Sequence, residues 1–122
     1  MLYGQRFYQE EFGRVSDIEW LPDTFGYCAS LPQILKHGGV RYFMTTKLNW
    51  NDTNVFPYDL FRWVGIDGTP MLSYLNHGIN EHTTPKDIHD HWQSYRQKDV
   101  YPEQMLLYGH GDGGRRRDAR NA

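Results

Sequence analysis

The 122-residue sequence has few of the features that mark secreted, disulfide-bonded or membrane-spanning proteins. It contains a single cysteine, Cys28, so no disulfide can form within the chain. It also lacks any apolar run of the length that a signal peptide or a membrane-spanning helix needs. We therefore predict a cytoplasmic protein that has no membrane partner.

The sequence also lacks a large net charge, which is −2 overall, but its charges are unevenly distributed. Residues 115–122 hold four arginines and one aspartate and form a basic tail. Basic segments can bind nucleic acid, but no aromatic residues interleave with these arginines. We therefore predict a disordered, solvated tail and no nucleic-acid partner. Nucleic-acid binding stays an alternative that rests on this tail alone.

What the sequence does contain is enough apolar surface for one small folded domain, since 39% of its residues are hydrophobic and 16% are aromatic. Helical spacing and strand-like alternation follow one another along the chain without an internal repeat. Helices are predicted over residues 3–12, 31–37 and 85–98, and strands over 15–21, 40–48, 61–66, 71–75 and 105–108. The order α-β-α-β-β-β-α-β favours the α/β fold class.

This set of elements is too small to cover a sheet of the α/β kind. Such a sheet buries both faces, and its edge strands need covering. The chain also begins inside a predicted helix and ends soon after a predicted strand. We therefore expect a truncated piece of a larger domain.

The segment WLPDTFGY at residues 20–27 is the strongest candidate for a functional site. It places Asp23 just after a predicted strand, where α/β proteins hold their ligand-binding groups. The aromatic residues Trp20, Phe25 and Tyr27 are suited to form a wall against a sugar ring. An ordinary strand-to-loop turn with an aspartate cap explains the same residues, and the pattern alone leaves both interpretations open.

The same segment resembles the nucleophile motif of the family 38 α-mannosidases. The resemblance covers residues 3–114 in the family's order, through five further blocks: LPQI at 31–34, YFMTTKLNWN at 42–51, FP at 56–57, FRWVGIDG at 61–68 and YGHGDGG at 108–114. It implies that residues 1–114 are part of a catalytic domain built as a seven-stranded β/α barrel. The family continues with more glycines and a proline, so the basic tail over residues 115–122 is a divergent end.

By this resemblance, the parent protein is a retaining α-mannosidase that removes terminal α-D-mannose from an oligosaccharide or glycan. Asp23 matches the residue that attacks the anomeric carbon and also binds zinc in that family. Retaining glycosidases pair such a nucleophile with an acid/base carboxylate roughly 5 Å away. In the family, the zinc contacts sugar hydroxyls and acts as a template and a Lewis acid.

Three other residues take roles from the same resemblance. Lys47 matches a basic residue beside the nucleophile, where its charge would keep the Asp23 carboxylate ionised. Asp67 resembles an active-site carboxylate of the family. The acid/base residue follows the predicted hairpin around Asp67, and Glu81 is the candidate in that stretch. The alternatives are a surface position for Lys47 and a turn position for Asp67.

The resemblance also implies one zinc ion, for which this chain supplies only Asp23. In the family, a His-x-Asp pair precedes the matched part and a further histidine follows it. A catalytic zinc has about three protein ligands, so we expect the isolated chain to be inactive. The alternative function is that of a non-catalytic truncated fragment, which binds carbohydrate weakly through Trp20, Phe25 and Tyr27.

The six histidines and the cysteine suggest no second site. No histidine pair has the i, i+4 spacing of a helical zinc motif. We therefore predict solvent-facing histidines, including His77, His89 and His91. Cys28 falls where the family has a small residue, and we predict that it is buried.

Overall fold

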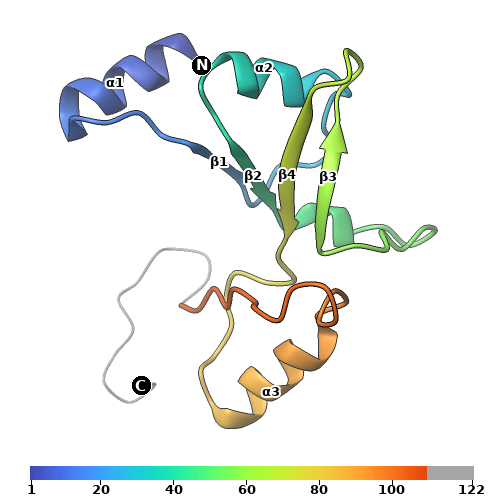
Figure 1. Cartoon of the computed structure of the whole chain (residues 1–122). Coiled ribbons are helices and arrows are strands. Elements are labelled where there is room, and N and C mark those ends of the chain that lie inside the picture. The colour runs from blue at the N-terminus through green and yellow to red at the C-terminus, as the bar shows by residue number, and fades with distance from the viewer. Residues whose placement is uncertain (110–122) are drawn as a thin grey trace.

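A computed structural model describes residues 1–109 of the chain. The end of the glycine-rich segment and the predicted basic tail over 115–122 lie outside the described residues. Three α-helices, one 3-10 helix (η1) and four strands follow one another along the chain (Figure 1). In order they are α1 (Leu2–Phe12), β1 (Ile18–Leu21), α2 (Leu31–His37), β2 (Tyr42–Thr45), η1 (Lys47–Asn49), β3 (Leu60–Val64), β4 (Pro70–Leu75) and α3 (Pro85–Ser94).

The four strands form one mixed sheet in the order β1-β2-β4-β3. Strands β1, β2 and β4 are parallel, and β3 pairs antiparallel to β4 through a hairpin. The register aligns Leu21 with Thr45 and Thr45 with Leu75. The three parallel strands therefore end at the same edge of the sheet, which brings together the segments that follow them.

Helix α2 covers one face of this sheet and creates the core. Its Leu35 packs in a buried cluster with Val40, Phe43 and Met71. Pro32 lies in the first turn of the helix, where a proline is tolerated, and Gly38 and Gly39 follow its last turn. The helix is held against β2 and β4 because its apolar side faces their buried side chains.

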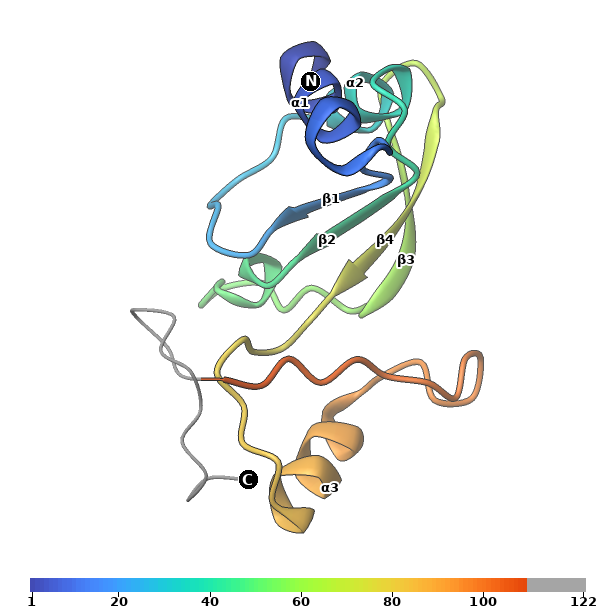
Figure 2. The ribbon, with the colours of Figure 1, turned by 90° about the vertical axis from the view of Figure 1, so that its left-hand side faces the viewer.

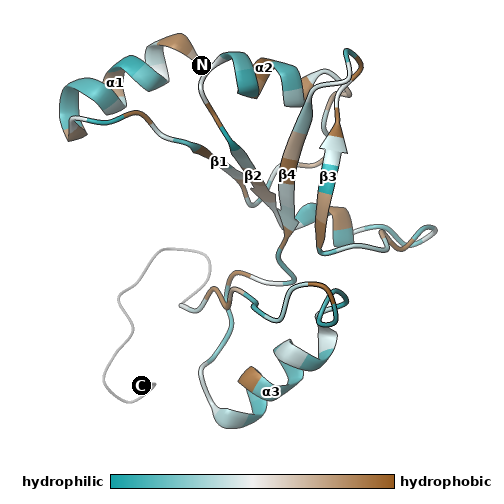
Figure 3. Cartoon of the chain, viewed as in Figure 1, coloured by the Kyte–Doolittle hydropathy of each residue, from teal (hydrophilic) through white to brown (hydrophobic). Residues whose placement is uncertain are grey.

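The opposite face of the sheet is largely open. Ile18, Trp20 and Leu72 on this face are each about half exposed, although the strands are among the most hydrophobic parts of the chain (Figure 3). Helix α1 has no buried residue and is fastened by the side chain of Gln5, which bonds to Ser16 and to the backbone of the segment after α2. The α/β class is confirmed, and the described strands form an open sheet.

Residues 76–109 form a second layer beyond the edge where β4 ends (Figures 1 and 2). Thr84 caps α3 by accepting the Asp87 N–H, and Pro85 occupies the first turn. The helix ends at Ser94, four residues before its predicted end, because Tyr95 turns into an extended conformation and buries its ring. No helix among residues 1–109 is long and apolar enough to cross a membrane.

Three predictions of local structure are wrong. Residues 105–108 form no strand, because this segment pairs with only one residue, in the bridge between Tyr108 and Glu81. Cys28 is exposed rather than buried, since it lies in the loop before α2. His91 is buried rather than exposed, because its Nε2 pairs with the Met105 carbonyl 2.9 Å away.

Candidate active site

Asp23 lies in the turn directly after β1, at the edge where the parallel strands end. This turn is tied to the next strand, because the Thr46 hydroxyl donates a hydrogen bond to the Pro22 carbonyl. The side chain of Asp23 is 73% exposed, and its Oδ1 is 2.8 Å from Lys47 Nζ. The ion pair leaves most of the carboxylate accessible to a ligand.

Lys47 is held far more firmly than the acid it pairs with. Its side chain is only 9% exposed, and its ammonium lies 3.7 Å from the centre of the Trp50 ring and 5.2 Å from that of Phe25. The two rings meet edge to face with their centres 5.6 Å apart. Cation–π attraction to both rings therefore fixes the lysine beside the carboxylate of Asp23.

A cavity of about 440 Å³ opens beside this ion pair. Its lining includes Asp23 and Lys47, which come from the ends of β1 and β2, and residues 77–81, which follow β4. The parallel strands therefore build the cavity at the carboxyl edge of the sheet, as α/β folds commonly do.

Glu81 belongs to the lining of the same cavity. Its backbone is fixed on both sides, because its N–H donates to the Leu107 carbonyl and its carbonyl accepts the Gly109 N–H. Gly78 leaves room for its carboxylate, since a side chain at this glycine would collide with Oε1. The structure thus brings Asp23, Lys47 and Glu81 to one cavity, from three separate parts of the sequence.

Trp20 and Tyr27 lie away from this cavity, whereas Phe25 contacts Lys47 at its edge. Trp20 lines a different cavity of about 530 Å³ beside α1. Tyr27 stacks edge to face on Phe43 in the core, and its hydroxyl donates to the Thr24 carbonyl at 2.6 Å. The described geometry therefore gives Tyr27 a packing role and places only Phe25 near the candidate nucleophile.

Asp67 lies in the β3–β4 turn, at the end of the sheet opposite to Asp23. Its carboxylate accepts the Thr69 N–H at 2.9 Å, and this hydrogen bond holds the pKa of Asp67 below its ordinary value. Gly68 has a φ of 86°, as the turn requires. The structure does not bring Asp67 together with the residues of the cavity.

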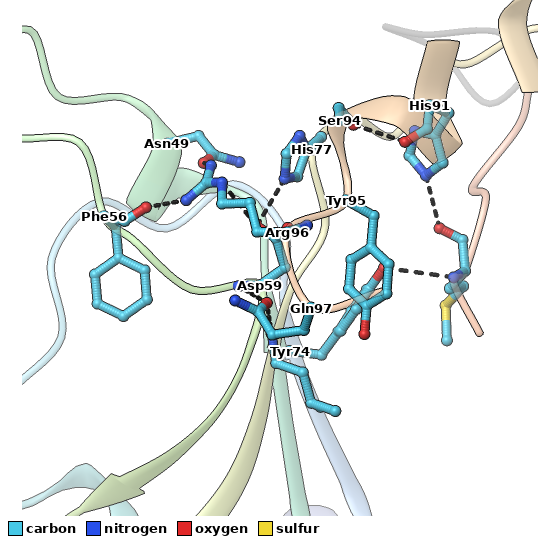
Figure 4. A network of polar contacts seen from close by, with 12 residues as sticks. Asn49, Phe56, Asp59, Tyr74, His77, His91, Ser94, Tyr95, Arg96 and Gln97 are labelled. Atoms are coloured by element: carbon cyan, nitrogen blue, oxygen red, sulfur yellow. Dashed lines mark hydrogen bonds and ion pairs between the residues drawn. The ribbon is translucent and has the colours of Figure 1, made fainter. Parts of the chain in front are cut away.

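A buried acid that no sequence pattern pointed to lies near the cavity (Figure 4). Asp59 precedes β3, and its side chain is 1% exposed. Its carboxylate contacts His77 Nε2 at 2.7 Å and Arg96 Nε at 3.5 Å. Nothing in the local sequence marks Asp59 as buried, because its partners are 18 and 37 residues away.

The described residues do not make a complete zinc site. Asp23 and Glu81 line one cavity, but residues 1–109 contain no group of three or more histidine, cysteine, aspartate or glutamate side chains placed to hold a metal ion. A catalytic zinc takes about three protein ligands. We therefore assign no chemical step to a metal in this chain.

Comparison with known proteins identifies the family of the chain. A model of the glycosyl hydrolases family 38 N-terminal domain matches residues 1–120. The chain belongs to family 38. It is 45% identical over 115 residues to alpha-mannosidase G of Dictyostelium discoideum, 42% to an alpha-mannosidase of Saccharomyces cerevisiae and 40% to human alpha-mannosidase 2C1.

These alignments cover 92–93% of the family 38 chain but only 10–11% of each relative. The chain thus spans about a tenth of the length of the curated relatives that it matches. The predicted family resemblance is confirmed.

Proposed function

We propose that this chain supplies the nucleophile of a retaining α-mannosidase that cleaves terminal α-D-mannose. The observation that carries the proposal is the pairing of an exposed Asp23 with a buried Lys47, beside a cavity, in a chain of family 38. A nucleophilic carboxylate must be both charged and accessible. The lysine stabilises the charge, and the 73% exposure of Asp23 provides the access.

In this mechanism, a carboxylate oxygen of Asp23 attacks the anomeric carbon and forms a glycosyl ester, while the bond to the leaving oxygen breaks. A second carboxyl group, protonated at the start, donates its proton to that oxygen, and the carboxylate so formed later removes a proton from the attacking water. Glu81 is the residue we assign to this role, because it lines the same cavity. Phe25 is positioned to contact the sugar at the edge of the cavity, since it already stacks near Lys47.

The proposal includes a zinc ion. Asp23 would be one of its ligands, and the other ligands would come from outside the described residues. The ion would contact sugar hydroxyls as a Lewis acid.

We also propose that the open sheet belongs to a β/α barrel, with its uncovered face turned inward. Ile18, Trp20 and Leu72, which are half exposed here, would then be covered. The exposed free thiol of Cys28 suits a reducing compartment such as the cytoplasm.

The test is covalent trapping with an α-mannosyl fluoride that carries a second fluorine on the ring to slow hydrolysis of the ester. Fluoride leaves without protonation, so labelling reports on the nucleophile alone. We expect mass spectrometry to find a mannosyl adduct on Asp23 and none in the Asp23→Asn variant. Asp52→Asn is the matched control, because Asp52 lies in an exposed loop away from the cavity.

Sustained turnover of a chromogenic α-mannoside is measured in parallel. We expect it to be absent in the isolated chain, because the described residues do not hold zinc. An adduct on another residue, or no adduct at all, would overturn the proposal. The second outcome would favour the alternative, a protein that binds carbohydrate without catalysis.

A further inference from the structure

His77 lies between the buried acid and the candidate active site. Its Nε2 is 2.7 Å from Asp59 Oδ1, and the residue belongs to the lining of the cavity that Asp23, Lys47 and Glu81 also line. The His77 side chain is 21% exposed. The imidazole therefore contacts the protein interior through one nitrogen and keeps part of its surface accessible.

Asp59 is firmly fixed, so it can hold the imidazole in one orientation. Its Oδ2 accepts the backbone N–H of Arg96 at 2.8 Å, and the guanidinium of Arg96 lies 3.5 Å from Oδ1. The Asp59 and Leu60 N–H groups both donate to Gln97 Oε1, at 2.6 and 3.0 Å. Figure 4 shows these contacts converging on Asp59 from the segment after α3.

The contact with Asp59 also determines which nitrogen of His77 carries the hydrogen. A charged carboxylate only accepts hydrogen bonds, so the hydrogen lies on Nε2. In the neutral ring, Nδ1 is then an acceptor with a free lone pair. Within residues 1–109, Nδ1 has no hydrogen-bond partner.

We propose that His77 contacts the substrate, with Nδ1 accepting a hydrogen bond from a hydroxyl group of the α-mannoside, and that Asp59 positions its ring. This inference rests on the proposed function of the cavity. Asp23 and Lys47 in the same cavity form an ion pair. With its hydrogen on Nε2 alone, His77 would add an acceptor that can bind a hydroxyl without bringing another charge close to the nucleophile.

The first test reads the tautomer of His77 by long-range proton–nitrogen NMR of the full 122-residue chain labelled with nitrogen-15. We expect a protonated Nε2 and an unprotonated Nδ1. A ring protonated on Nδ1 alone would overturn the inference, because the acceptor would then be missing. This measurement needs no sugar and no activity.

The second test adds methyl α-D-mannopyranoside, with methyl α-D-glucopyranoside as the control sugar. We expect the mannoside to shift the His77 Nδ1 signal and to leave His37 unchanged, because His37 is an exposed residue at the end of α2 and does not line the cavity. A shift at Lys47 and Glu81 without one at His77 would overturn the inference. No shift at any cavity residue would overturn it as well.

Variants separate substrate contact from a purely structural role. In His77→Gln, the side-chain amide can still donate to Asp59, but no atom replaces Nδ1. We expect this variant to keep the unfolding midpoint of the wild type and to bind the mannoside about tenfold more weakly, as the loss of one hydrogen bond predicts. His37→Gln, at the exposed end of α2, is the matched control and should bind as the wild type does.

Equal binding by His77→Gln and the wild type would overturn the inference. Failure of the inference and failure of the proposed function are distinguishable, because the second is decided by labelling of Asp23. A labelled Asp23 together with an unaffected His77 removes only the role of the histidine. If neither Asp23 nor His77 responds, both proposals fail.

Discussion

Two aspartates in this molecule pair with cations in opposite ways. Asp23 is 73% exposed, whereas the Lys47 beside it is 9% exposed. Asp59 is 1% exposed, whereas the Arg96 beside it is 28% exposed. In the first pair the protein buries the cation and leaves the acid accessible. In the second it buries the acid and leaves the cation closer to solvent.

The difference separates an acid available for chemistry from an acid used for structure. Within residues 1–109, the polar contacts of the Asp23 carboxylate are limited to the ion pair with Lys47. Those of Asp59 include His77, the backbone of Arg96 and its guanidinium. A buried carboxylate needs such partners, because an unpaired buried charge costs several kcal/mol. Asp59 therefore links the sheet to the segment after α3, while Asp23 can face a ligand.

The largest effect on stability is expected at the buried acid. Asp59→Ala removes the common partner of His77 and Arg96, and we expect it to lower the free energy of unfolding by about 3 kcal/mol. Urea denaturation followed by circular dichroism measures this change. The control is Asp52→Ala, at an exposed loop position. A loss of less than about 1 kcal/mol at Asp59, as for a surface pair, would remove the distinction between the two acids.

An intermediate effect is expected from the alkaline titration of Tyr74. Burial raises the pKa of Tyr74 from 10.0 to about 12, and the negative charge of Asp59 adds to the rise. Because folding favours the neutral phenol, this contribution to stability is fully present below pH 10 and is lost as the pH rises toward 12. Urea midpoints taken across this pH window should fall accordingly.

The same titration sharpens the comparison of the acids. We expect Asp59→Asn to lower the pKa of Tyr74 slightly and to leave it above 10, since burial is the larger cause. Asp23→Asn should not change it. Carbon NMR of the Tyr74 ring as a function of pH gives the value for each variant. An equal response to both substitutions would contradict the separation of the two sites.

The smallest effect on stability is expected at the exposed acid. Asp23→Asn keeps an oxygen that can accept a hydrogen bond from Lys47, and the ammonium of Lys47 also keeps its contacts with the Trp50 and Phe25 rings. We therefore expect the urea midpoint to stay close to that of the wild type, although the same variant should lose the mannosyl adduct. A large loss of stability would show that Asp23 has a structural role as well.

Much of the fold could be predicted from local patterns. Helix α2 was predicted at its observed bounds, because Pro32 at its start and Gly38 after its end mark both termini. The β3–β4 hairpin was also predicted, because its strands flank a turn sequence that contains Gly68. The prediction of a strand over residues 105–108 was wrong. A short apolar run forms a strand only if another strand lies beside it along its length.

The candidate site was predictable only in part. The resemblance on residues 20–27 pointed to Asp23, and the structure places Lys47 and Glu81 at the same cavity. Phe25 and Tyr27 belong to the same motif, yet Phe25 lies beside Lys47 and Tyr27 packs in the core. A motif does not specify which way each aromatic ring turns, because the rest of the fold determines which side is buried.

The sequence by itself determined the family, the α/β class and the position of Asp23 after a strand, since these depend on local patterns and short motifs. The tertiary structure decided which residues gather around that aspartate. Asp59, His77 and Arg96 are far apart along the chain and meet because β3, the end of β4 and the segment after α3 converge there. Burial is the physical reason, because a buried charge needs partners and only packing brings distant partners within reach.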